Sequence, residues 1–355
     1  MAKILIKNGR VWDGKSFFDA DVFVDGNQVV KIAKNIDEAA TFVFDAKGMT
    51  VSAGLIDAHT HLRGISCDKY GTQAEMSCFP FGVTAAADGG AGKGDKALLE
   101  SFMLKTLVFV AANIKNNQAD FSGVEKMWKL YKDKMVGVKS YFDSNAGEIE
   151  NVKPLEDICT FAHKRDLRVM VHCTGSPIPL SEILSTLQKG DILTHAFNGS
   201  ANNAEIDGFA SMKDAQKRGV LIDVGFAGNV HTDFGIMKRA LEAGIVPDII
   251  STDITRLSAF VRGGRYGLTM CMSIAKLLGM SEDAIFRAVT SNPATALGMS
   301  GEWGRLKEGG KADVAVIREC NEPFALTDKN QNTVKSEISY RCALTISDGQ
   351  IVYKD

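Results

Sequence analysis

The sequence has no excess of charge of either sign and no long apolar stretch. Lysine and arginine together number 41 and aspartate and glutamate 43, which gives a net charge of −2 at pH 7. Such a balance argues against a nucleic-acid or anionic-membrane surface as the main binding function. The longest strongly apolar stretch, Thr106–Ile114, is far too short to cross a bilayer. We therefore expect neither a nucleic acid nor a membrane as a partner.

The sequence also lacks paired cysteines and a leader segment. Its seven cysteines are scattered, and none belongs to a Cys-x-x-Cys pair. A disulfide framework is therefore not expected, and a reducing compartment explains the pattern more simply. Residues 1–7 contain no long apolar core and no small-residue cleavage site, so we expect no signal peptide. Together these features predict a cytoplasmic protein.

The composition that remains is that of an ordinary globular protein. The 355 residues are 45% hydrophobic and 24% charged, which excludes a disordered, collagen-like or coiled-coil chain. The length suits one large barrel-type domain with a small addition, or two domains of medium size.

Both ends of the sequence are rich in short β-type runs. Asp25-Gly26-Asn27 is a tight-turn signal within the first fifty residues, and Asp348-Gly349-Gln350 repeats it near the other end. Neither end by itself is long enough to bury a two-sided sheet. We therefore predict that residues 1–50 and 305–355 pair into one small β-sandwich formed by both termini.

The middle of the chain, residues 51–304, alternates short apolar runs with helical patterns. Eight such runs predict an α/β fold, a (β/α)8 TIM-type barrel. An open doubly wound sheet is the alternative, but it needs a glycine-rich dinucleotide turn after the first strand, where Asp57-Ala58-His59-Thr60 stands. The predicted strands are Leu55–Ala58, Val83–Asp88, Thr106–Ala111, Val136–Phe142, Arg168–Val171, Asp191–Thr194, Val220–Val224 and Asp248–Thr252.

Four of the six histidines follow predicted barrel strands at their carboxyl ends, where barrel enzymes place their active sites. His59 and His61 end the first strand, His172 the fifth and His195 the sixth. Residues two apart in a strand point to the same side, about 6–7 Å apart, so the first two imidazoles can bind one cation. The pattern predicts a metal site. We expect His163, on a polar helix face, to be solvated.

The segment Gly54–Arg63, with its His-x-His, resembles the amidohydrolase superfamily, whose hallmark is this motif on the first strand of a (β/α)8 barrel. The family pattern continues with a lysine on strand four, a histidine on strands five and six, and an aspartate on strand eight. The sequence offers these residue types in the same order: Lys139, His172, His195 and Asp253. The resemblance covers nearly the whole length.

Finer features resemble two branches of that superfamily. Gly82-Val-Thr84, Asp88–Gly92 and Thr194–Gly199 look like the dihydroorotase-like deacetylases. Leu62-Arg63 resembles true dihydroorotases, but their strand-two region rich in Met-Pro-Asn is missing. The resemblance therefore favours the deacetylase side of the branch.

The resemblance implies a centre of two divalent metal ions with Lys139 carboxylated by carbon dioxide as an anionic bridge. His59, His61 and Asp253 would hold the first ion, and His172 and His195 the second, each with the bridge. Zinc is the expected metal, since imidazole and carboxylate ligands suit it at a hydrolytic site. The alternatives are a rim ion pair for the lysine and a helix N-cap for the aspartate.

Three further residues are candidates for substrate binding. Arg63 follows His61 by two and can hold a carboxylate through two parallel bonds, although a structural salt bridge is the alternative. Asn198 either contacts substrate or caps a turn. His231 lies in the loop after the seventh predicted strand, above the expected mouth of the barrel.

These assignments predict a binuclear metal-dependent hydrolase. A hydroxide bridging the ions would attack a C–N amide, N-acyl or cyclic, of a small anionic substrate, with Asp253 as the proton shuttle. A purine-type deaminase is an alternative that usually runs on one metal without the bridging lysine, and an esterase is another. The non-enzymatic alternative is a metal-free structural relative, but such a protein would have lost ligands. A homo-oligomer stays open, because large barrels often associate.

Overall fold

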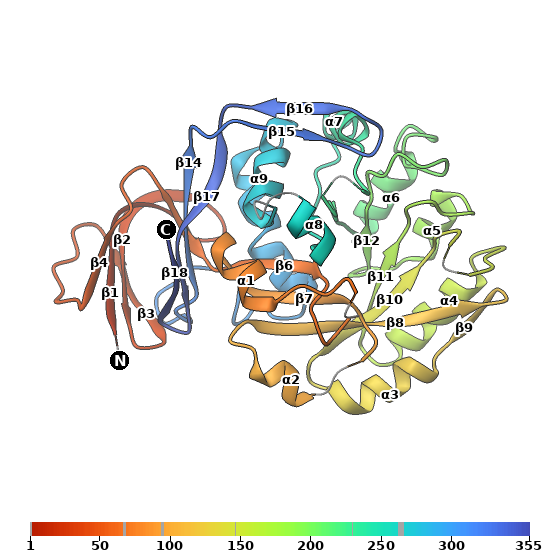
Figure 1. The fold of residues 1–355 in the computed structure, drawn as a ribbon, viewed down its shortest axis with the longest axis horizontal. Helices are drawn as coiled ribbons and strands as arrows, with labels where there is room; N and C mark the ends of the chain where they lie inside the picture. Colours follow the sequence, from red (N-terminus) through yellow and green to blue (C-terminus); the bar gives the residue numbers. More distant parts are fainter. Residues whose placement is uncertain (1, 67–68, 94–95, 146, 229, 262–265) are drawn as a thin grey trace.

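The computed structural model describes residues 2–66, 69–93, 96–145, 147–228, 230–261 and 266–355. It contains two large sheets, one from the termini and one from the middle of the chain (Figure 1). In the described ranges, no helix has the length and apolar character that a bilayer crossing requires.

Strands from both ends of the chain form one eight-stranded sheet, which confirms the predicted pairing of the termini. The short strand β5 joins them, since it pairs with β1 on one side and with β14 on the other. The order is β18 (Gln350–Lys354), β17 (Ser339–Ser347), β14 (Val314–Cys320), β5 (Thr50–Ala53), β1 (Lys3–Trp12), β2 (Phe17–Asp25) and β3 (Gln28–Ala33), with β4 (Phe42–Asp45) beside β1.

This terminal sheet curls around a core of its own. Gln28 at one edge forms a bridge with Lys311 near β14, so the sheet bends back on itself. The two predicted turns meet there, because a Cβ on Gly349 would lie 1.7 Å from the carbonyl oxygen of Gly26. Gly349 also has a φ of 76°, which favours glycine. The enclosed core consists of aliphatic side chains, among them Ile4, Ile6, Val22, Val51, Val314 and Val316.

The second sheet is the predicted barrel wall. Seven parallel strands follow in chain order, and the short β9 (Gln118–Asp120) pairs antiparallel with β8. Apolar residues of β6, β7, β8, β11 and β12 form one cluster that fills the interior, while their neighbours pack against the helices. The strands are β6 (Leu55–Thr60), β7 (Val83–Ala91), β8 (Lys105–Lys115), β10 (Met135–Tyr141), β11 (Arg168–His172), β12 (Ile192–Thr194) and β13 (Leu221–Ile222).

The eighth predicted strand closes the ring without forming a regular strand. Ile249 bridges Asp223 on one side, and Ile254 bridges Thr60 of β6 on the other. Between these bridges Asp253 adopts a φ of 46°, which interrupts the extended backbone, and its N–H donates to the carbonyl of His59 at 2.7 Å. The barrel prediction is thus confirmed, but the segment predicted as Asp248–Thr252 is irregular because of this left-handed residue.

Most helices lie outside the curved sheet (Figure 1), but the last helix contributes Ala294 and Ala296 to the cluster that fills the interior. The helices of the described residues are α1 (Ala74–Cys78), the 3-10 turn η1 (Phe79–Phe81), α2 (Lys96–Ser101), α3 (Ser122–Tyr131), α4 (Lys153–His163), α5 (Leu180–Thr186), α6 (Ala210–Arg218), α7 (Phe234–Glu242), α8 (Arg256–Val261), α9 (Leu268–Leu277), α10 (Glu282–Ala288) and α11 (Ser291–Ala296).

One part of the C-terminal segment lies on the barrel. The hairpin of β15 (Phe324–Thr327) and β16 (Thr333–Ser336) sits beside α7 (Figure 1). Asp328 in its turn accepts the N–H of Phe234 at 2.9 Å, and the amide of Asn330 donates to Asp233 at 2.6 Å. Domain boundaries at residues 50 and 305 stay a prediction, since this hairpin belongs spatially with the barrel.

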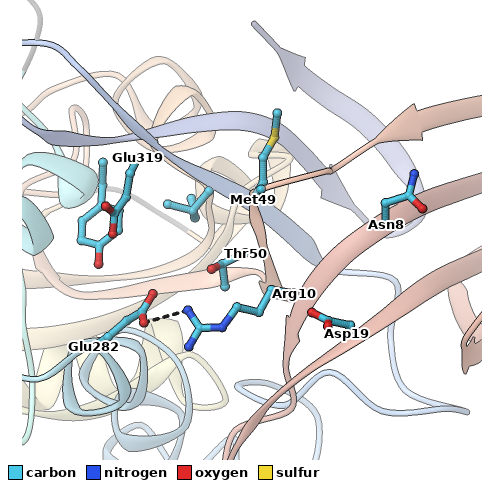
Figure 2. Close-up of a pocket in the computed structure, with 10 residues that line it drawn as sticks. Asn8, Arg10, Asp19, Met49, Thr50, Glu282 and Glu319 are labelled. Carbon is cyan, nitrogen blue, oxygen red and sulfur yellow. Dashed lines mark hydrogen bonds and ion pairs between the residues drawn. The ribbon is translucent and has the colours of Figure 1, made fainter.

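A polar cavity of about 360 Å³ separates the terminal sheet from the barrel (Figure 2). Arg10 of β1 crosses it and pairs with Glu282 of α10 at 2.8 Å. Asp19, Glu319 and Tyr340 also line it. This contact fixes the terminal sheet against the barrel, and no predicted ligand of the metal site lies in the cavity wall.

Candidate metal centre

Two triads of metal-binding side chains lie at the carboxyl ends of the barrel strands. His59, His61 and Asp253 form the first triad, and His172, His195 and His231 form the second. In each triad, ligand atoms from all three residues lie within 4.8 Å of one another. The structure thus places five of the six predicted ligands in these triads, together with His231, which the sequence suggested as a substrate contact.

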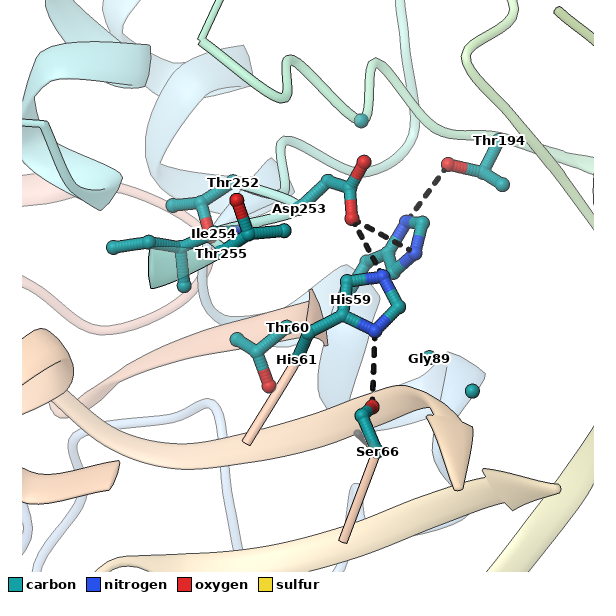
Figure 3. A network of polar contacts seen from close by, with 12 residues as sticks. His59, Thr60, His61, Ser66, Gly89, Thr194, Thr252, Asp253, Ile254 and Thr255 are labelled. Carbon is teal, nitrogen blue, oxygen red and sulfur yellow. Dashed lines mark hydrogen bonds and ion pairs between the residues drawn. The ribbon is translucent and has the colours of Figure 1, made fainter. Parts of the chain in front are cut away.

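Asp253 lies at the centre of the first triad (Figure 3). Its Oδ1 is 2.9 Å from Nε2 of His61 and 3.4 Å from Nε2 of His59. Burial by itself raises the pKa of the Asp253 carboxyl, but the neighbouring imidazoles of His59 and His61 outweigh it and lower that pKa. The carboxyl is therefore an anion, and two imidazoles and a carboxylate form a donor set that suits zinc.

Lys139, the sixth predicted ligand, points into the barrel from β10. Its register partner on β11 is Met170, which belongs to the interior cluster, and Val138 faces the helices. The lysine side chain is fully buried, with Nζ 3.0 Å from Nε2 of His59. Burial lowers the pKa of Lys139 to about 8. A rim position in solvent, one of the alternatives, does not agree with this burial.

The second triad is a set of three neighbouring imidazoles. The ring centroids of His172 and His195 are 4.5 Å apart, and His231 lies 4.1 Å from His195 and 4.9 Å from His172. Burial lowers the pKa of all three, that of His231 to about 3. Neutral imidazoles carry the lone pair that a metal ion requires.

Unused donor atoms in the second triad fit a bound cation. Within the described ranges, the buried Nε2 atoms of His172 and His195 form no hydrogen bond. The carboxylates that lie nearest are Asp143, 3.5 Å from the first, and Asp253, 3.7 Å from the second. Buried polar atoms are normally paired, so these free nitrogens indicate a missing partner of positive charge.

Buried polar residues that the sequence analysis missed hold the His59 ring in place. Nδ1 of His59 lies 3.0 Å from the hydroxyl of Thr194, and that hydroxyl donates to Asp223 at 2.7 Å. Ser251 donates to the same carboxylate at 2.8 Å. With Nδ1 engaged, Nε2 is directed at the centre. The only signal of this support in the sequence was Asp223, an aspartate near the end of the apolar run Val220–Val224.

A similar arrangement orients His61. Its Nδ1 lies 3.0 Å from the hydroxyl of Ser66 (Figure 3). That hydroxyl donates to Asp88 at 2.7 Å. Asp88 also accepts the N–H of Leu62 at 2.7 Å. The imidazole is thereby fixed from behind, which pre-organises the first triad for a cation.

Backbone geometry aims two of the predicted ligands. His195 has a φ of 58° and Asp253 a φ of 46°, both in the left-handed region that non-glycine residues rarely adopt. Thr194, the residue before His195, already points inward, so continued strand alternation would turn His195 outward. Strained backbone of this kind is concentrated at functional sites.

Glycine lets the backbone of β7 approach the His59 ring. A Cβ on Gly89 would lie 2.1 Å from Cδ2 of His59, and one on Gly225 would lie 2.6 Å from Nδ1 of His195. Gly92 has nothing within 4 Å of such an atom. The glycine-rich segment after the second barrel strand therefore serves close packing around the first triad.

The other two candidates for substrate binding lie in different surroundings. Arg63 is exposed and lines a surface pocket with Gln73, Glu75 and Leu98, and it belongs to neither triad. Asn198 is buried, and its amide donates to the carbonyl of His195 at 3.0 Å and accepts the N–H of Ser200. These bonds are those of a turn-capping residue, one of the two roles considered for Asn198.

A further group, Cys159, His163 and Asp191, lies at the start of β12, away from the carboxyl ends. His163, expected to be solvated, is only partly exposed, with 26% of its side chain accessible and its Nε2 3.0 Å from Asp191. The same carboxylate accepts the N–H of Val169 at 2.9 Å and that of Gln188 at 2.8 Å. These bonds join α4 to the barrel wall, and this end of a barrel serves stability.

Comparisons with known proteins agree with this architecture. A deacetylase from Enterococcus faecalis is 29% identical over 374 residues, which cover 98% of this chain and 98% of that protein. A dihydroorotase from Streptococcus thermophilus is 26% identical over 431 residues, which cover 99% of this chain and 100% of that protein.

Solved structures show the same fold. An adenine deaminase superposes with a TM-score of 0.85 at 25% identity over 100% of both chains, and a dihydroorotase with 0.85 at 20% over 99% of both. The model of the amidohydrolase family matches residues 50–352. The predicted resemblance is confirmed, and the chain belongs to the amidohydrolase family.

Proposed function

We propose that this protein is a binuclear metal-dependent hydrolase that cleaves the C–N amide bond of a small anionic N-acyl or cyclic-amide compound. The observation that carries the proposal is the meeting of both triads around Asp253. Its Oδ1 contacts His61 and its Oδ2 lies 3.7 Å from Nε2 of His195. One carboxylate therefore adjoins both candidate ion positions.

In this proposal the first triad holds one divalent cation and the second triad's His172 and His195 hold another, both most suitably Zn²⁺. Lys139 is the bridge, carboxylated by carbon dioxide. That reaction needs a neutral amine, and burial lowers the pKa of Lys139 to about 8, which raises the neutral fraction near pH 7. Carboxylation would also replace the positive charge of a buried ammonium with the negative charge of a carbamate.

When bound, the cations supply a hydroxide nucleophile at neutral pH and polarise the substrate carbonyl. Asp253 would accept the proton of the nucleophile and deliver it to the leaving nitrogen, for which its position between the triads is suitable. Burial lowers the pKa of His172, His195 and His231, which favours the neutral imidazoles that a cation requires. Thr194 and Ser66 hold the rings of His59 and His61 so that the site needs little reorganisation.

Deacetylation is the reaction within this class that we favour, because the relative from Enterococcus faecalis is named a deacetylase and matches end to end. Arg63 remains the proposed partner of a substrate carboxylate, although it lies in the pocket beside α1. Asn198 and His231 are the other proposed substrate contacts, and the hydrogen bonds of Asn198 favour a turn-capping role for that residue.

Deamination of a purine-type ring is the second candidate, since the adenine deaminase structure covers the whole chain. Lys139 argues against it, because the resemblance associates purine deaminases with one metal and no bridging lysine. Ester cleavage stays open, since the same nucleophile attacks esters. A metal-free structural relative is disfavoured by the retention of all six predicted ligands.

The remaining expectations are part of the same proposal. We expect a small-molecule substrate, no nucleic-acid or membrane partner and a cytoplasmic location. Association into a homo-oligomer stays open.

Metal content and a substrate panel test the proposal. Purified protein should contain close to two equivalents of divalent metal and hydrolyse members of a set of N-acetylated and cyclic-amide acids. Ammonia release from aminopurines with no hydrolysis of amides would favour the deaminase. Protein that holds well under one equivalent and rebinds none would show a structural relative instead.

A further inference from the structure

His231 is a member of the second triad although it does not lie at the end of a barrel strand. It comes from the loop that joins β13 to α7, and its side chain is 17% exposed. Its ring lies 4.1 Å from that of His195, tilted by 35°, and 4.9 Å from that of His172, nearly perpendicular to it at 87°. One nitrogen atom from each of the three rings lies within 4.8 Å of one from each of the others.

The segment that follows His231 is fixed by hydrogen bonds, so this placement is part of the fold. Asp233, two residues after His231, donates its N–H to the carbonyl of Phe197 at 2.9 Å. Its carboxylate caps α7 by accepting the N–H of Ile236 at 2.8 Å and also accepts from Asn330 of the hairpin. Thr232 between them is buried. The imidazole is thereby held near the other two at little entropic cost.

Packing alone does not explain why the three imidazoles leave buried nitrogen atoms without hydrogen-bond partners. Nδ1 of His231 is buried without a hydrogen bond, as are Nε2 of His172 and Nε2 of His195, counting all described residues. A buried nitrogen without a hydrogen-bond partner is unfavourable, and each of the three rings leaves one such atom. A divalent cation bound by all three would satisfy them together.

We propose that His231 is a third protein ligand of the second ion, which is thereby held by three imidazoles with one position open. This inference rests on the proposed function, because it assumes the binuclear centre. Three protein ligands and one open position is the arrangement of catalytic zinc sites in general. His231 would thus add one protein ligand to the two imidazoles and the Lys139 bridge of the proposed function.

The charge of the two positions would differ as a consequence. The first triad includes the Asp253 anion in addition to the shared bridge, whereas the second ion would have three neutral imidazoles and only the shared bridge. Asp253 Oδ2 lies 3.8 Å from Nε2 of His231, at the border between the two. The second ion would therefore be the one that attracts an anionic group of the substrate.

The test is metal binding to the protein freed of metal by a chelator. Co²⁺ is titrated into the wild type and into His231→Ala, and visible absorption and bound equivalents are measured. The wild type should bind two equivalents. The variant should retain the first and bind the second more than about 100-fold more weakly, since even an outer hydrogen-bond partner of a ligand is worth about 10- to 100-fold. Added imidazole should restore the second equivalent.

His163→Gln is the matched control, a histidine outside both triads, and it should bind two equivalents. His231→Gln serves if the alanine variant does not fold, with the same loss expected. Two tightly bound equivalents in the His231 variants, with only a raised KM, would overturn the inference in favour of substrate contact and leave the proposed function intact. A wild type that binds no metal would overturn the proposed function itself.

Discussion

Asparagine in place of Asp253 separates proton transfer from metal binding. The amide keeps the shape of the carboxylate and keeps an Oδ1 beside His61 and His59, which lie 2.9 and 3.4 Å from it. It cannot accept a proton at neutral pH. We therefore expect both ions to remain at saturating metal, while kcat falls about 10²- to 10⁴-fold, the usual contribution of a general base. This loss corresponds to about 3–5 kcal/mol of activation free energy.

The assay is the initial rate on the best substrate of the amide panel at saturating metal, with metal content measured on the same samples. Asp223→Asn is the matched control, because that carboxylate supports His59 from behind, through Thr194 and at 3.8 Å from Nδ1 of His59. Its loss should be smaller, about 10- to 100-fold, and should come through weaker metal binding. An Asp253→Asn enzyme with full metal content and a kcat within threefold of the wild type would refute the proton-shuttle role.

Three more variants test the bridge, the substrate contact and the packing of the site. Lys139→Ala should fall from two bound ions to about one, with partial rescue of activity by short carboxylic acids; two tightly bound ions would exclude the bridge. Arg63→Met should raise KM for anionic substrates about 10- to 100-fold with little change in kcat, as expected for a charge-assisted pair; an unchanged KM removes Arg63 from the site. Gly89→Ala should lower the free energy of unfolding by about 1–3 kcal/mol through overpacking against His59, and it should weaken metal binding. Gly92→Ala, with open space around it, should do neither. Equal effects of the two variants in chemical denaturation would show that the close contact is unimportant.

The eighth barrel strand shows where sequence patterning reached its limit. The run Asp248–Thr252 looks like the other seven, and it does close the ring. Its irregularity comes from the left-handed backbone of Asp253, which the fold imposes through the bond to the His59 carbonyl. Local preference disfavours such a conformation, so a pattern of apolar residues cannot predict it.

The partners of the metal ligands show the same limit. Thr194 lies 135 residues after His59, and Asp223 follows Thr194 by 29 residues; both support the His59 ring from other strands. Nothing in the local sequence of His59 indicates them. Likewise the distance from His231 to His195 depends on a loop whose path is set by α7 and the hairpin, so the sequence suggested only that His231 lies near the mouth.

The sequence alone determined the alternation of strands and helices, the pairing of its two ends and the order of the ligand types, because each follows from short-range periodicity or from a spacing of two residues on one strand. Only the tertiary structure decided which side chains meet. Arg63, close to His61 in sequence, lines another pocket, while His231, distant from every predicted ligand except Asp253, joins two of them. The physical reason is that loop paths and ring orientations depend on contacts between residues far apart in the chain.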